Sequence, residues 1–174
     1  GVMHSANTMY SNILPYAERL NLDRNDVVLM ASPMAHQTGF MYGLMMPVVL
    51  GCPAVILDVW DAPTAISIVN NYGATFTMAS TPFLADLTDT VATAGTGVPS
   101  LRTIPGPLVE RAQPTLGTTI VSAWGMSENG AITTTMLDDD PARAIETDGC
   151  PLPGVEVRIA DDDGNTLPTG DIGR

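Results

Sequence analysis

Short runs of apolar residues recur along the chain and predict the strands of one sheet. The runs are Val27–Ala31, Ala54–Leu57, Thr75–Ala79 and Thr119–Ala123. They are continuous rather than alternating, which is typical of strands that are covered on both faces. We therefore expect buried, mostly parallel strands at these positions.

The segments between these runs carry apolar residues at helical spacing. Asn7 or Thr8 can cap the first helix, and Pro15 should kink that helix or shift its start. Four apolar faces are predicted: Met9, Ile13, Ala17 and Leu20; Phe40, Leu44, Met45 and Val48; Ala65, Ile66 and Val69; and Leu84 and Leu87. The third of these helices should begin at Asp61-Ala62-Pro63 and the fourth at Pro82. A fifth helix is predicted over 108–116. The alternation predicts an α/β fold, in which helices cover a mostly parallel sheet through right-handed crossovers.

The composition changes after about residue 145, where prolines and glycines become frequent. Val155, Val157 and Ile159 alternate with polar residues and predict a half-buried strand, and Asp163-Gly164 predicts a hairpin turn. We therefore divide the chain into an α/β part, residues 1–145, and the start of a small C-terminal β element, residues 146–174.

The formal net charge is −12, and all 7 basic residues are arginines. Such a surface repels phosphate backbones, so nucleic acid is not an expected partner, and anionic membranes are disfavoured for the same reason. No apolar run approaches the ~20 residues that span a bilayer, and no signal peptide opens the chain. The clusters Asp138–Asp140 and Asp161–Asp163 are interpreted as solvated turns, with metal chelation as the alternative.

The two cysteines, Cys52 and Cys150, fit no metal-ligand spacing. Buried thiols in a reduced, cytoplasmic protein are the expectation, and a structural disulfide is the alternative. The sequence leaves open whether the protein forms a homo-oligomer.

The stretch Trp124-Gly125-Met126-Ser127-Glu128 follows the last apolar run directly. Ligands of parallel sheets bind beyond the carboxyl ends of the strands. An indole can stack on a planar base, glycine admits a close ligand, a hydroxyl can donate to phosphate, and a carboxylate can hold Mg²⁺. A tryptophan that covers the core and a glutamate that caps a helix would give the same pattern.

This stretch resembles the YGxTE motif of AMP-forming adenylating enzymes, with Trp124 in place of tyrosine and Ser127 in place of threonine. Three further segments resemble that family in the same order. Gly1–Ser5 is similar to the tail of the phosphate loop, 33–40 to the P-x-x-H-x-x-G segment, and 149–159 to the G-x-P-x-P-G strand. The stretches 122–135 and 147–151 most resemble cyclohexanecarboxylate and medium-chain fatty-acid CoA ligases.

The resemblance implies an acid–thiol ligase that uses ATP, Mg²⁺ and coenzyme A to make an acyl-adenylate and then a thioester. It implies that Ala123, Trp124, Gly125 and Met126 flank the nucleotide, with Ser127 at the α-phosphate and Glu128 on Mg²⁺. It also places His36 between the acyl pocket and the thiol tunnel, although a lone histidine is more often a buried structural side chain. His4 is interpreted as structural.

The expected substrate is an apolar, medium-chain or alicyclic carboxylic acid. Relatives that activate amino acids need a buried acidic partner for the substrate ammonium, because an unpaired buried charge is costly. By resemblance that partner would lie within 33–49, which contains no Asp or Glu.

The resemblance places the phosphate loop before Gly1 and the ribose-binding aspartate after Arg174, and the chain contains no lysine. We therefore expect the middle of a large N-terminal domain that is inactive alone. Between 103 and 107 the chain is shorter than the family's loop, either through a deletion or through an omitted loop. The alternative functions are an adenylation domain that loads a carrier protein and a non-catalytic nucleotide-binding domain.

Overall fold

A computed structural model describes all 174 residues and contains a central sheet of five parallel strands. Their order is β2-β1-β3-β4-β5, with Val28 opposite both Ala54 and Phe76. The predicted parallel sheet is confirmed, but the sequence missed β4, a short run that ends in proline. The strands are β1 (Val28–Met30), β2 (Ala54–Ile56), β3 (Phe76–Thr77), β4 (Thr103–Pro105) and β5 (Thr119–Val121).

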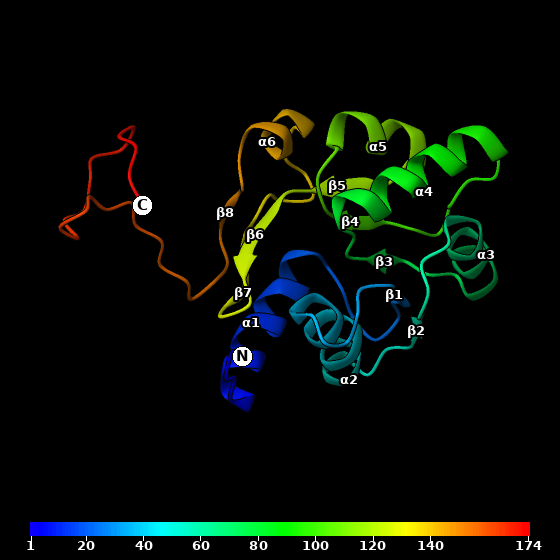
Figure 1. Cartoon of the computed structure of the whole chain (residues 1–174), viewed down its shortest axis with the longest axis horizontal. Coiled ribbons are helices and arrows are strands. Elements are labelled where there is room, and N and C mark those ends of the chain that lie inside the picture. Colours follow the sequence, from blue (N-terminus) through cyan, green and yellow to red (C-terminus); the bar gives the residue numbers. More distant parts are fainter.

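Helices cover both faces of this sheet, as Figure 1 shows. Adjacent residues of β1 point to opposite sides: Leu29 packs among the buried residues of α3, α4 and α5, while Met30 packs among those of α1 and η1. Two apolar cores therefore sandwich the sheet. The helices are α1 (Ala6–Arg19), η1 (Gly39–Met45), α2 (Met46–Leu50), α3 (Ala62–Tyr72), α4 (Thr81–Ala94), α5 (Val109–Leu116) and α6 (Pro141–Glu146).

Helix α1 has the predicted apolar face but a different start. Ser5 is the N-cap, and its hydroxyl accepts a hydrogen bond from the amide of Thr8 at 3.2 Å. The expected caps, Asn7 and Thr8, instead lie inside the first turn. The helix continues through Pro15 as far as Arg19.

The predicted face of the second helix is wrong. Phe40, Leu44 and Val48 are 40%, 45% and 69% exposed, whereas Met41 and Tyr42 are buried. The reason is the π-helical segment η1, whose wider turns change which positions share a face. A prediction based on 3.6 residues per turn therefore selects the wrong side.

A small antiparallel sheet confirms the expected β element, but its strands lie elsewhere. It consists of β6 (Ala123–Met126), β7 (Gly130–Thr134) and β8 (Cys150–Pro151), in the order β6-β7-β8. The strand expected over 155–159 is wrong, since this segment forms no regular strand and Val157 is 47% exposed. Pairing begins only at its end, where the carbonyl of Ile159 accepts a hydrogen bond from the amide of Leu167 at 2.9 Å. The turn at Asp163-Gly164 is present, closed by the amide of Gly164 on the carbonyl of Asp161 at 3.1 Å. Figure 1 shows the chain beyond β8 running away from the two sheets.

The aspartate clusters make turn contacts, as expected. Asp139 accepts a hydrogen bond from the amide of Met136, Asp140 caps α6, and Asp161 accepts from the amides of Asp163 and Asn165. No group of three or more His, Cys, Asp or Glu side chains could hold a metal ion.

Both cysteines are free, so the structure contains no disulfide. Cys52 is half-buried, but Cys150 is exposed, because it lies on β8 at the edge of the small sheet. The expectation of buried thiols is therefore wrong for Cys150. None of the helices combines the length and hydrophobicity that crossing a bilayer requires.

Candidate functional site

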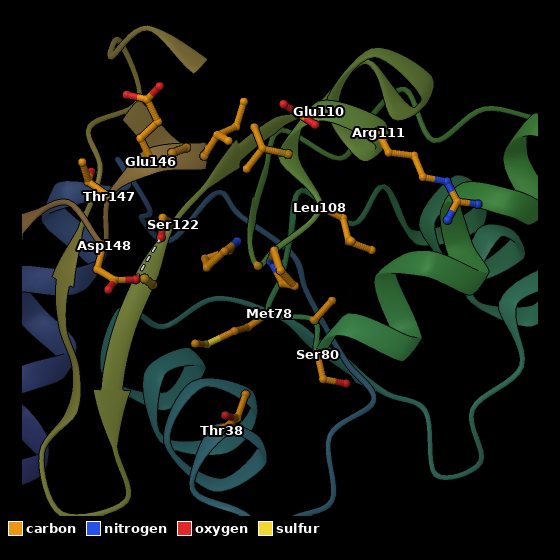
Figure 2. A pocket seen from close by; sticks show the side chains of 18 of the residues that line it. Thr38, Met78, Ser80, Leu108, Glu110, Arg111, Ser122, Glu146, Thr147 and Asp148 are labelled. Carbon is orange, nitrogen blue, oxygen red and sulfur yellow. Dashed lines mark hydrogen bonds between the residues drawn. The ribbon is translucent and has the colours of Figure 1, made fainter. Parts of the chain in front are cut away.

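A cleft of about 740 Å³ opens where the strands of the parallel sheet end. Strand order reverses between β1 and β3, and ligands of open parallel sheets bind at such a reversal. Figure 2 shows the side chain of Met78 in the middle of the cleft. The lining residues at or just beyond the ends of the parallel strands are Ser32, Met78–Ser80, 105–109 and Ser122–Ala123.

The other walls come from the segment just before η1, from the start of α5, and from the end of α6 with the residues that follow it. His36 and Thr38 contribute one side, and 144–148 contribute the opposite side. The hydroxyl of Ser122 donates to the carboxylate of Asp148 at 3.5 Å, which joins the end of β5 to the segment after α6 (Figure 2). The cleft therefore has an apolar centre with hydroxyl and carboxylate groups along one wall.

His36 is exposed on the cleft wall, so the alternative of a buried structural histidine is wrong. The amide of Thr38 donates to Nδ1 of His36 at 3.2 Å. Because Nδ1 accepts this bond, Nε2 carries the proton of the neutral ring. That arrangement leaves one N–H group available to a ligand.

The candidate nucleotide-binding stretch forms a strand of the small sheet. Ala123 lines the cleft, and β6 continues from there along one side of it (Figure 2). Trp124, which is 43% exposed, and Gly125 lie further along this strand. A Cβ on Gly125 would overlap the backbone of Gly130, so the close pairing of β6 with β7 requires glycine here.

Ser127 and Glu128 lie in the turn that joins β6 to β7. The amide of Met126 donates to the side chain of Asn129 at 2.8 Å and closes the turn. The side chains of Ser127 and Glu128 are exposed and make no hydrogen bond or ion pair within the chain. A single free carboxylate suits Mg²⁺, which takes one or two protein oxygens and completes its shell with phosphates and water.

Sequence reasoning missed several cleft residues, notably Thr38, Ser80 and Asp148. Ser80 had a usable signal, since it follows an apolar run at the carboxyl end of a predicted strand. Ser32 had the same signal after the first run. Residues 105–109 also lie in the wall, and Leu108 adopts a left-handed conformation there, with φ 62°.

Comparison with known families gives one match along the whole chain: residues 1–174 match the family described as AMP-binding enzyme. The chain belongs to this family. Among AMP-binding enzymes it is 31% identical over 177 residues to the medium-chain fatty-acid–CoA ligase of Escherichia coli (strain K12). This match covers 98% of the chain and 31% of the relative, so the chain spans about a third of that protein.

Solved AMP-binding enzymes share the fold. ATP-bound MatB from Rhodopseudomonas palustris superposes with a TM-score of 0.88 at 25% identity, covering 99% of this chain and 35% of that one. A putative long-chain-fatty-acid CoA ligase from the same organism superposes with a TM-score of 0.87 at 26% identity, covering 99% of this chain and 44% of that one. These matches confirm the expected architecture, part of the N-terminal domain of an adenylate-forming enzyme.

Proposed function

We propose that this chain belongs to an acid–thiol ligase that joins a carboxylic acid to coenzyme A. A carboxylate oxygen attacks the α-phosphorus of ATP and pyrophosphate leaves, which forms an acyl-adenylate. The thiolate of coenzyme A then attacks the acyl carbon, and AMP leaves. Residues 1–145 would form part of the large N-terminal domain, and 146–174 would begin its β-rich part.

The observation that carries this proposal is the hairpin beside the cleft. Its strand begins with cleft-lining Ala123, continues through Trp124 and ends in a turn with the free side chains of Ser127 and Glu128. An aromatic face, a hydroxyl and a carboxylate in this order suit a base, a phosphate and a divalent cation.

The residues of the hairpin take the following proposed roles. Trp124 flanks adenine, with Ala123, Gly125 and Met126 providing adjacent backbone. The Ser127 hydroxyl donates to an α-phosphate oxygen. Glu128 holds Mg²⁺, which, when bound, offsets the charge that crowds at the phosphorus during attack.

The proposed substrate is an apolar, medium-chain or alicyclic acid. Met78 and Ala79 line the cleft, and the segment 33–49, which contributes His36 and Thr38 to its wall, carries no acidic side chain. Of the three acidic residues that line the cleft, Glu110 and Glu146 lie at the upper rim in Figure 2, away from Met78, and Asp148 accepts the hydrogen bond of Ser122. An apolar pocket separates homologues by only ~1–3 kcal/mol per methylene, so we expect a graded preference over chain and ring sizes.

The test uses the protein expressed from its complete coding sequence. It is incubated with ATP, Mg²⁺, coenzyme A and either hexanoate, cyclohexanecarboxylate, benzoate, acetate or phenylalanine, and acyl-CoA and pyrophosphate are measured. Hexanoate and cyclohexanecarboxylate should give the highest kcat/KM. A preference for acetate or phenylalanine of more than about tenfold would overturn the pocket assignment.

Two further outcomes separate the alternative functions. Pyrophosphate release without acyl-CoA would instead favour a carrier-protein thiol as acceptor. No pyrophosphate with any acid would favour a non-catalytic domain. The 174 residues on their own contain no lysine to neutralise departing pyrophosphate, so we expect them to release none.

A further inference from the structure

Two polar side chains are buried together in the core beneath α1. Asn12 is 5% exposed and Tyr42, on η1, is fully buried, amid apolar neighbours that include Ile13 and Met41. The Tyr42 hydroxyl donates to Oδ1 of Asn12 at 2.7 Å. Burial raises the pKa of Tyr42 to about 12, so the hydroxyl keeps its proton and its donor role.

This pair makes further hydrogen bonds to the start of β7. The amide of Ala131 donates to the Tyr42 hydroxyl at 2.8 Å, and Nδ2 of Asn12 donates to the carbonyls of Ala131 at 2.7 Å and Asn129 at 3.1 Å. Gly130 packs so closely on Asn12 that an added Cβ would lie 2.7 Å from its amide carbon. The C-terminal end of the β6–β7 turn is therefore fixed to α1 and η1.

The other end of the same turn is held by His4. Its Nε2 lies 2.6 Å from the carbonyl oxygen of Ser127, and its Nδ1 lies 3.3 Å from the hydroxyl of Thr8 in the first turn of α1. Because a carbonyl oxygen only accepts, Nε2 is the donor. His4, just before α1, and Asn12, on α1, thus hold the turn on the two sides of Glu128.

Fold stability does not by itself require this arrangement. A buried hydrogen bond contributes little net stability, and apolar groups of matching shape can replace both partners at small cost. What a fully satisfied buried network does provide is a single geometry. The network in this chain fixes the one segment that carries the free side chains of Ser127 and Glu128.

We propose that Asn12, Tyr42 and His4 are positioning residues that hold the β6–β7 turn so that Ser127 reaches the α-phosphate of the nucleotide and Glu128 reaches its Mg²⁺. This inference rests on the proposed function for its catalytic consequence. Tyr42 lies on η1, which directly follows the cleft-lining residues His36 and Thr38. The same hydrogen bonds therefore connect the β6–β7 turn to that wall of the cleft.

The first test is Tyr42→Phe in the complete protein, which deletes one oxygen from the network. We expect kcat/KM for ATP to fall ~10- to 100-fold, as small misplacements of reacting groups do, while KM for hexanoate stays unchanged. Val69→Ala, in the core on the other side of the sheet, is the control: it lowers the melting temperature but leaves kcat/KM for ATP unchanged.

A mutant cycle with the pair Glu128→Gln and Ser127→Ala separates positioning from general destabilisation. If Tyr42 acts through the turn, its substitution should have less than about a twofold further effect once both side-chain groups are gone. An effect of Tyr42→Phe as large in that background as in the wild type would overturn the proposal. His4→Ala should reproduce the loss and His4→Gln should restore most of it, since the Gln amide can still donate to Ser127; equal activity of the two would also overturn it.

Hydrogen exchange of the nucleotide-free protein gives a readout that does not depend on catalysis. Tyr42→Phe should speed exchange in the peptide that covers 127–131 and leave that of α4 unchanged. Unchanged exchange in 127–131 would overturn the anchoring itself. A wild-type protein that releases no pyrophosphate, yet shows the faster exchange in the variant, would contradict the proposed function and support the anchoring.

Discussion

Gly125 and Gly130 approach each other across the β6–β7 ladder so closely that a side chain on Gly125 would overlap the Gly130 backbone. Gly125→Ala should therefore push the two strands apart, abolish more than about nine-tenths of ATP-dependent activity and lower the melting temperature. Gly97→Ala is the matched control, because an added Cβ at Gly97 meets nothing within 4 Å. Equal activity of the two variants would show that the close pairing of β6 with β7 is not needed.

Glu128→Gln should leave the fold intact and slow adenylation about a hundredfold, which corresponds to a loss of ~3 kcal/mol at the transition state. The amide keeps the shape of the side chain but loses the charge that attracts Mg²⁺. The dependence of the rate on Mg²⁺ concentration is the measurement, with exposed Glu18→Gln as control. Wild-type rate and Mg²⁺ dependence in Glu128→Gln would make Glu128 a structural acid.

His36→Ala should impair thioester formation more than adenylation. His36 lies on the cleft wall with Nδ1 engaged by the amide of Thr38, which leaves Nε2 for a ligand. We expect acyl-CoA formation to fall ~10-fold or more, with pyrophosphate–ATP exchange changed less than about threefold. His36→Asn retains an acceptor for the Thr38 amide, so it distinguishes the effect of losing this hydrogen bond from the effect of losing the imidazole ring. Equal losses in both half-reactions would remove His36 from the transfer step.

Asp26 should make stability depend on pH in the acid range. It is 3% exposed, and burial raises its pKa, but hydrogen bonds from Thr75, the Asp23 amide and Arg102, together with the Arg102 charge, bring the pKa below its usual value. A carboxyl whose pKa is lower in the folded state than in the unfolded state stabilises the fold. This stabilisation is complete above the unfolded-state pKa of about 3.9 and is lost as the pH falls through the folded-state pKa.

Asp26→Asn should therefore destabilise the protein by ~1–3 kcal/mol at pH 7 and by much less near pH 3. Urea unfolding at both values is the measurement. Asp171→Asn is the control, because Asp171 is exposed and its side chain makes no hydrogen bond. A difference between wild type and Asp26→Asn that stayed constant from pH 7 to pH 3 would exclude the charge as its source.

The sequence predicted the parallel sheet because burial on both faces leaves continuous apolar runs such as that around Leu29 and Met30. It did not predict β4, since the run that ends in Pro105 is short and flanked by turn residues. The burial of Tyr42 was also missed, because a π-helical turn has no sequence signature at the level of hydrophobic spacing.

The candidate site was predictable to the extent that it is local in sequence. The candidate residues from Trp124 to Glu128 could be identified from the sequence because they are consecutive. The contact of Asn12 with Ala131 and that of His4 with Ser127 join segments more than a hundred residues apart, with separations of 119 and 123. Such contacts are set by tertiary packing, and no local pattern indicates them.

The most direct measurement follows one oxygen atom through the reaction. Hexanoate labelled with ¹⁸O in its carboxylate is incubated with the complete protein, ATP, Mg²⁺ and coenzyme A, and the products are analysed by mass spectrometry. If the carboxylate attacks the α-phosphorus, one labelled oxygen must leave with AMP when the thioester forms, and pyrophosphate must stay unlabelled. Label in inorganic phosphate with release of ADP, or label absent from AMP, would show that no acyl-adenylate forms and that the proposed reaction is wrong.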